Sequence, residues 1–255
     1  MTSKDKYSKK AKDKANEVLS ASPTLIDSME EVLSKLDDSI EKVELKLGQS
    51  LKEGAVNNDL NVPSFLSEAV KAARNYTIEV TTNISIMEKM ITLNFPVIED
   101  GNNFGVTVQL SILKMLKETR EALSTKIKAI GASYYDARAN AIDKLGLAKE
   151  TMTETITKTQ GKSESQSSKD NAKETEEKGG ETRSEEKKKS GASAVDSYRM
   201  QQLLAIDLQA YVDAKAALVA ALDGYCAICD NVSKNKDKLE SPKGLSGGTS
   251  HMSMF

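Results

Sequence analysis

Residues 66–91, LSEAVKAARNYTIEVTTNISIMEKMI, carry the pattern that decides the fold class. Side chains suited to a core recur there every three or four residues, which keeps them on one face of an α-helix. They are Leu66, Val70, Ala73, Thr77, Val80, Ile84, Met87 and Ile91. The pattern stops before Pro96, because proline lacks an N–H and restricts the residue before it. We therefore predict one long amphipathic helix over this stretch.

Three further stripes with the same spacing fill most of the remaining chain. The first begins at Ser22 and Pro23, a pair typical of a helix start, and a shorter helix is predicted before it over 4–19. The stripes comprise Leu25, Met29, Val32, Leu36, Ile40, Val43, Leu47 and Leu51; Val106, Leu110, Leu113, Leu116, Leu123, Ile127, Ile130, Tyr134, Ala137, Ala141 and Leu145; and Leu203, Ile206, Ala210, Ala214, Ala217, Ala221, Tyr225, Ile228 and Val232. The predicted fold is all-α, an up-down-up-down four-helix bundle with long helices.

The composition supports this fold and narrows the function. The 255 residues include no Trp, only 4 Pro and 4% aromatic side chains, which disfavours a sheet-rich fold. A net charge of −2 argues against a generally basic nucleic-acid binder. Two Cys and a polar N-terminal stretch predict no disulfide framework, signal peptide or membrane span. A single histidine, His251, disfavours His triads and multi-His metal sites, so neither catalysis nor a cofactor is expected.

By composition, the chain divides into five parts. Residues 157–194 contain no Val, Ile, Leu, Met, Phe or Tyr, and their basic and acidic side chains are interleaved. This mixture predicts a disordered, solvated spacer, whereas a nucleic-acid arm would need segregated basic residues. The parts are 1–21, an N-terminal helix or extension; 22–156, the first three bundle helices with a loop at 96–105; 157–194, the charged insertion; 195–238, the fourth helix; and 239–255, a flexible C-terminal tail.

Two side-chain pairs within the predicted helices have a structural explanation. Cys226 and Cys229 form a C-x-x-C inside the fourth stripe, without the further Cys, His or strand that a zinc or redox site needs. Core packing is therefore favoured over metal binding or redox chemistry. Tyr134 and Tyr135 are adjacent on the third helix, where one can face the core and the other a neighbour.

The connection PVIEDGNNFG, residues 96–105, is the loop with the most unusual composition. Its Gly and Asn residues tolerate positive φ, which suits a tight turn. Glu99, Asp100 and Asn102 could hold a divalent cation, although they lack the regular oxygen spacing of an EF-hand. A plain surface turn is the alternative.

The predicted topology brings this loop close to the chain ends. In an up-down-up-down bundle the N-terminal end, the 96–105 loop and the C-terminal tail share one end. The 54–63 turn and the charged insertion share the other. The tail finishes in two apolar residues, Met254 and Phe255. One end of the bundle is thus expected to carry the unusual loop and an apolar chain terminus.

The stretch from Phe95 to Gln109, FPVIEDGNNFGVTVQ, resembles the activation loop and following helix start of the 11S proteasome activators, ATP-independent caps also called REG proteins. Residues 99–109 carry the specific part of the similarity. Weaker similarities are Tyr134-Tyr135 before Arg138, VDSYR at 195–199, and SPKG at 241–244 before an apolar C-terminus.

The resemblance implies a seven-membered ring of four-helix subunits that docks on the 20S proteasome and opens its gate without ATP. It implies that the tails enter pockets between proteasome α subunits, where each terminal carboxylate meets a lysine, while the loops push a turn at the α-subunit N-termini. By this resemblance, the activation loop is Glu99, Asp100, Gly101, Asn102, Asn103, Phe104 and Gly105, and the docking tail ends in Ser253, Met254 and Phe255. The implied partners are the 20S α subunits and further copies of this chain, a homoheptamer, with no nucleic acid.

One departure and one alternative accompany this interpretation. Some animal members carry their charged segment between the first and second helices, whereas here it lies between the third and fourth, so no role is assigned to it.

The alternative function is a structural or scaffolding bundle that binds membrane surfaces through the basic stretch from Lys4 to Lys14. An enzyme is the least favoured class, because no acid, base, nucleophile and metal set converges in the sequence. The expected location is the cytoplasm, with the nucleus left open.

Overall fold

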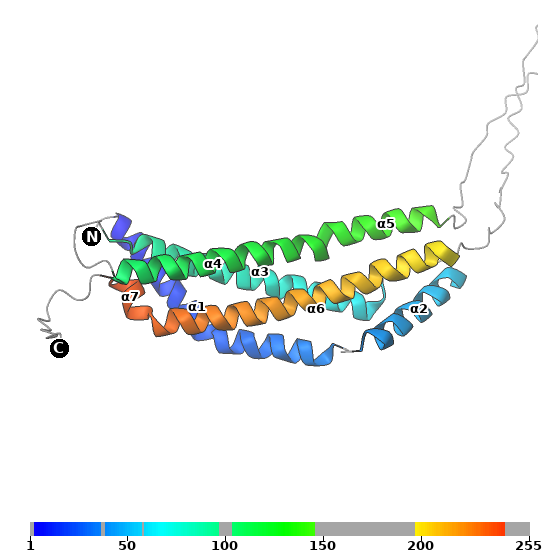
Figure 1. Cartoon of the computed structure of the whole chain (residues 1–255), viewed down its shortest axis with the longest axis horizontal. Helices are drawn as coiled ribbons and strands as arrows, with labels where there is room; N and C mark the ends of the chain where they lie inside the picture. Colours follow the sequence, from blue (N-terminus) through cyan, green and yellow to red (C-terminus); the bar gives the residue numbers. More distant parts are fainter. Residues whose placement is uncertain (1–2, 37–38, 58, 97–103, 146–196, 243–255) are drawn as a thin grey trace, which may run out of the picture. The chain divides into compact units, whose positions relative to one another are not determined.

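The computed structural model describes residues 3–36, 39–57, 59–96, 104–145 and 197–242, and every regular element in these ranges is a helix (Figure 1). The elements are α1 (Ser3–Lys35), α2 (Ile40–Asn57), α3 (Ser64–Leu93), α4 (Phe104–Lys128), the π-helix η1 (Ala129–Ser133), α5 (Tyr134–Lys144), α6 (Ser197–Lys234) and α7 (Lys236–Glu240). They form the four antiparallel arms of a bundle. The first arm is α1 followed by α2, the second is α3 alone, the third is α4 followed by η1 and α5, and the fourth is α6 followed by α7. The predicted all-α four-helix bundle is confirmed.

The predicted helix start at Ser22 is wrong, and with it the boundary between residues 21 and 22, because α1 continues through Pro23. A proline inside a helix leaves the carbonyl four residues earlier without its usual amide donor. Here that carbonyl belongs to Leu19, and it accepts a hydrogen bond of 2.8 Å from the Ser22 hydroxyl. Ser22 is buried, so its side chain replaces the donor that proline removes instead of capping a new helix.

The first stripe was predicted as one helix from 25 to 51, but the structure divides it between α1 and α2. Ser39 stands immediately before α2, and its hydroxyl accepts the backbone N–H of Lys42 at 3.4 Å. This is the third residue of α2, the position that an N-cap side chain contacts. Both pieces still bury their part of the stripe, Met29 in α1 and Leu47 in α2.

The second stripe matches the prediction along its length. Each of its eight predicted core positions is buried in α3, from Leu66 to Ile91. The helix ends at Leu93, three residues before Pro96, as the restriction on residues preceding proline predicts.

The third arm differs from its prediction in start, phase and continuity. Phe104 and Gly105 belong to the first turn of α4, not to the loop. Leu110, assigned to the core, is 56% exposed, and its neighbour Gln109 is 0% exposed. The error has a physical reason: the periodicity was set by apolarity alone, and a polar side chain occupies the inward position.

The same arm contains a π-helical turn that no pattern predicted. Gly131, inside η1, has φ −103° and ψ −124°, which departs from helical geometry. An extra residue in a helical turn shifts the face that follows it. Because of this break, α4 and α5 are not one regular helix, and a single helical period cannot describe the buried positions of both.

The fourth arm packs its small residues against the rest of the bundle, and α3 is its main neighbour. Ala210, Ala214, Ala217 and Ala221 are all buried, as predicted. A Cβ at Gly224 would come within 2.8 Å of the Thr119 methyl group, so a glycine here permits the close approach of α4 to α6. The predicted single helix over 195–238 is interrupted after Lys234, and α7 follows as a separate short turn.

Candidate functional site

Four chain segments meet at one end of the bundle: the start of α1, the end of α3, the start of α4, and α7 (Figure 1). The Ser8 hydroxyl donates to Asn94 Oδ1 at 3.2 Å, which joins α1 to the residue that follows α3. Lys12 Nζ lies 2.7 Å from Glu240 Oε2, which joins α1 to α7. These contacts hold together segments that are far apart in the sequence.

Gln109 lies at the centre of this end. Its Nε2 donates to the carbonyl of Leu239 in α7 at 2.9 Å and to the carbonyl of Asn94 at 3.4 Å. Both partners are acceptors, so the amide nitrogen must face them. One side chain of α4 therefore contacts both the end of α3 and α7.

The backbone of α4 also lies directly against Pro242, two residues after the end of α7. A Cβ added at Gly105 would overlap the carbonyl oxygen and Cα of Pro242. Only glycine permits this approach, and Gly105 is buried although it lies in the first turn of α4. Phe104 beside it is 64% exposed, and the Lys238 ammonium lies 5.9 Å from the centre of its ring.

The sequence-predicted site residues fall partly outside the described ranges. Glu99, Asp100, Gly101, Asn102 and Asn103 of the predicted activation loop lie outside them, and so do Ser253, Met254 and Phe255 of the predicted docking tail. The structure does describe the residues on either side: the chain enters the loop after Pro96 and leaves it at Phe104, and the tail follows Pro242. Gly105, at the end of the predicted loop, and Pro242, before the predicted tail, are in contact.

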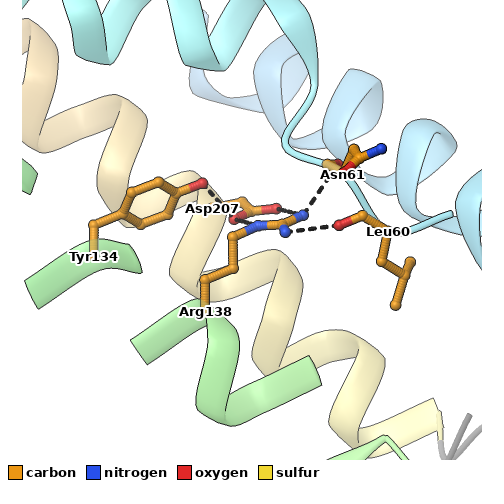
Figure 2. A network of polar contacts seen from close by, with 5 residues as sticks. All are labelled: Leu60, Asn61, Tyr134, Arg138 and Asp207. Carbon is orange, nitrogen blue, oxygen red and sulfur yellow. Dashed lines mark hydrogen bonds and ion pairs between the residues drawn. The ribbon is translucent and has the colours of Figure 1, made fainter. Parts of the chain in front are cut away.

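A buried polar network elsewhere in the bundle was missed by the sequence analysis (Figure 2). Arg138 Nε donates to Asp207 Oδ1 at 2.8 Å, and Tyr134 donates its hydroxyl to the same oxygen at 2.9 Å. Arg138 also donates to the backbone carbonyls of Leu60 and Asn61, at 2.7 and 3.2 Å. The network therefore ties the connection between α2 and α3 to α5 and α6.

This network satisfies charges that would otherwise be costly to bury. Asp207 is 0% exposed and Arg138 is 5% exposed. Burial, reinforced by the negative charge of Asp207, raises the pKa of Tyr134 above its usual value, so its hydroxyl remains a donor. The sequence does contain a signal for this network: Arg138 and Asp207 each place a charge within an apolar stripe, and Arg138 comes four residues after Tyr134. The sequence could not show that the two charges meet.

The remaining candidates pack in the helical core. Cys229 is buried and Cys226 is half-buried, and both thiols are free. Burial raises the pKa of the Cys229 thiol, which disfavours the reactive thiolate. Tyr134 faces the core, as one of the two tyrosines was expected to do, whereas Tyr135, expected to face a neighbour, is 45% exposed. The described residues contain no group of three or more His, Cys, Asp and Glu placed to hold a metal ion.

A groove of about 460 Å³ lies between η1, α5 and α6. Small side chains contribute to its lining, among them Ala129, Ala137 and Ala205, and so does Asp213. In the described part of the chain, no helix is both long and apolar enough to cross a membrane.

Comparison with known proteins connects this fold and loop to one family. Residues 60–159 match the family model of the C-terminal part of the proteasome activator PA28. A stretch of 68 residues is 37% identical to Proteasome activator 28 of Dictyostelium discoideum. That stretch covers 27% of this chain and 30% of the relative.

Solved structures resemble the chain over nearly its full length, at identities that establish the fold alone. The 11S subunit of the Plasmodium falciparum proteasome, PA28, has a TM-score of 0.58 and 19% identity, covering 94% of this chain and 92% of that one. The activator in a proteasome–11S activator complex has a TM-score of 0.59 and 15% identity, with coverage of 94% and 93%. The sequence match over residues 60–159 and the shared bundle fold make this chain similar to the 11S proteasome activators.

Proposed function

We propose that this protein is an ATP-independent activator of the 20S proteasome. It docks through its C-terminal tails, which end in Ser253, Met254 and Phe255, and opens the α-subunit gate with its activation loops, residues 99–103 together with Phe104 and Gly105 at the start of α4. Seven copies form the active ring. The result is faster entry and hydrolysis of peptides, with no chemistry performed by the activator itself.

The observation that supports this most directly is the contact between Gly105 and Pro242. An activator that binds the proteasome through its tail and displaces the gate with its loop needs both segments on the same end of the bundle. Gly105 closes the predicted loop, and Pro242 precedes the tail, so both segments leave the bundle at one place. If the loop and the tail left the bundle at opposite ends, they could not both contact the same surface of the proteasome.

The names of similar structures support the partner. Two of them are described as complexes, one of a proteasome with an 11S activator and one of an archaeal 20S proteasome with a mutated P26 activator. The second has a TM-score of 0.57 and 16% identity, and covers 94% of this chain and 93% of that one. We infer the same class of partner for this chain, and with it a cytoplasmic or nuclear location.

The tail and the loop have separate physical roles in this mechanism. A single tail places an apolar side chain and a carboxylate in a pocket, which gives weak binding. A ring multiplies that binding, because each docked tail raises the effective concentration of the next. The loop must then bind the open gate better than the closed one, since a ligand shifts an equilibrium only by its differential affinity.

The test uses the full chain and a purified 20S proteasome with a fluorogenic peptide substrate. We expect the wild-type protein to stimulate hydrolysis without ATP, and a variant lacking Met254 and Phe255 to lose both binding and stimulation. An Asn102→Tyr variant is expected to keep binding and lose stimulation. Stimulation that survives the truncation would contradict tail docking.

Native mass spectrometry distinguishes this proposal from a scaffolding bundle. A heptamer that binds the 20S particle supports the activator. A monomer or simple dimer that neither binds nor stimulates the particle would overturn it and favour the scaffold, for which vesicle flotation of the full chain tests attachment through Lys4 to Lys14.

A further inference from the structure

The short helix α7 takes its position from α4 more than from α6. The chain departs from helical geometry at Asn235, with φ −108° and ψ 12°, so α7 is not an extension of α6. A helix of this length has little stability of its own. Its main packing partner is α4, and its one buried residue, Leu239, is 0% exposed. The base of the tail is therefore anchored on the helix that begins at the loop.

Gln109 is the polar residue that makes this anchorage specific. It is 0% exposed, and its amide nitrogen contacts the carbonyls of both Leu239 and Asn94. Asn94 lies between α3 and the loop, and Leu239 lies between α6 and the tail. The two hydrogen bonds connect the entry to the loop with the entry to the tail through one side chain of α4.

Burying this amide has a cost that apolar packing would avoid. Gln109 Oε1 is buried and has no hydrogen-bond donor among the described residues. A buried polar atom without a partner is destabilising. The packing of α7 on α4 could be provided by an apolar side chain, whereas the link between the two carbonyls needs a donor.

We propose that Gln109 couples the tail to the loop: its amide holds Asn94 and Leu239 at a fixed separation, so that a docked tail sets the position of the loop base. This rests on the proposed activator function. Gln109 is a positioning residue that touches neither partner surface nor substrate. Without the Gln109 amide donor, the tail still docks, but the base of the loop is no longer held in the position that opens the gate.

The first test separates binding from stimulation in the full-length protein. Gln109→Met keeps side-chain length and removes the donor, and Gln109→Glu keeps the shape and places a carboxylate against two carbonyls. We expect affinity for a 20S proteasome within about twofold of wild type and maximal peptide hydrolysis reduced at least about fivefold, as loss of one or two hydrogen bonds allows. Gln201→Met, at an exposed position of α6, is the matched control and should change neither.

The second test needs no proteasome. The measurement is amide hydrogen exchange in the free protein at Leu239, Ser241 and Asn94, whose N–H groups donate to the carbonyls of Asn235, Asp237 and Ile91. In Gln109→Met these amides should exchange about five- to tenfold faster, while amides in the α3 and α6 core remain unchanged. This measurement also shows whether a variant is folded.

Each outcome decides one claim. Faster exchange together with normal binding and reduced stimulation supports the coupling. Unchanged exchange overturns the link through Gln109. Faster exchange with parallel losses of binding and stimulation, or with neither lost, overturns the coupling and leaves Gln109 a packing residue. A wild-type protein that neither binds nor stimulates the 20S particle refutes the proposed function instead, and the coupling that rests on it falls too.

Discussion

Where α2 meets α3, a buried arginine and aspartate join three chain segments, whereas beside α7 a neutral amide and a partly exposed ion pair join segments of the other end. The charged network gives Arg138 and Asp207 full hydrogen bonding at 5% and 0% exposure. The other end relies on Gln109, which leaves one buried oxygen without a partner in the described residues. The end beside the α2–α3 connection is thus held by a charged network whose members are hydrogen-bonded, whereas the end assigned to docking is held by a neutral amide and a partly exposed ion pair, each of which should contribute less to stability.

The largest expected effect lies in the charged network. Asp207→Ala leaves the Arg138 guanidinium buried without its counter-ion, and we expect it to destabilise the fold by about 3–5 kcal/mol. Chemical denaturation of the full chain measures this. Asp207→Leu combined with Arg138→Met removes both charges and should be less destabilised than Asp207→Ala. If the single variant unfolds at the wild-type denaturant concentration, the network does not lock this end.

A smaller effect is expected for the tyrosine of the same network. Tyr134→Phe removes a hydrogen bond to a buried carboxylate and should lower stability by about 2 kcal/mol at neutral pH. Tyr135→Phe, at the exposed neighbour, is the control and should change little.

The same tyrosine predicts a loss of stability at alkaline pH. Because the folded state raises the pKa of Tyr134, the unfolded chain releases this proton first as the pH rises. Its contribution is complete below the usual tyrosine pKa of about 10 and declines above it. A wild-type stability profile that falls no more steeply above pH 10 than that of Tyr134→Phe would argue against this contribution.

At the docking end, one methyl group tests the close approach of α4 and α7. Gly105→Ala forces the Pro242 backbone away, and we expect a cost of about 1–2 kcal/mol together with reduced stimulation of the 20S proteasome. Gly48→Ala is the matched control: its Cβ would meet only Leu204 Cδ2 at 3.9 Å, and alanine favours helix, so stability should rise by up to about 1 kcal/mol. Equal thermal shifts in the two variants would remove the contact from the mechanism.

The smallest effect is expected for the ion pair between Lys12 and Glu240. Because Lys12 is 43% exposed, the pair should contribute less than about 1 kcal/mol and weaken further in salt. A double-mutant cycle with Lys12→Ala and Glu240→Ala measures the coupling. A coupling energy near that of the Arg138–Asp207 pair would erase the contrast between the two ends.

Local periodicity determined much of this molecule. The α3 stripe from Leu66 to Ile91 predicted a helix that the structure confirms residue by residue, because a buried face repeats with the helical turn. The motif at 99–109 likewise carries the resemblance to the 11S proteasome activators. Such signals are local, and neighbours along the chain are sufficient to produce them.

Tertiary contacts decided the features that local patterns missed. Ser22 and Pro23 are typical of a helix start, yet α1 continues through them: packing in the bundle buries Ser22, and its hydroxyl donates to the carbonyl of Leu19, three residues earlier. Gln109 faces inward in place of Leu110 because its donor meets the carbonyls of Asn94 and Leu239, the latter 130 residues away in sequence. A buried polar side chain generally needs a hydrogen-bond partner, and sequence spacing alone does not show which distant segment supplies that partner.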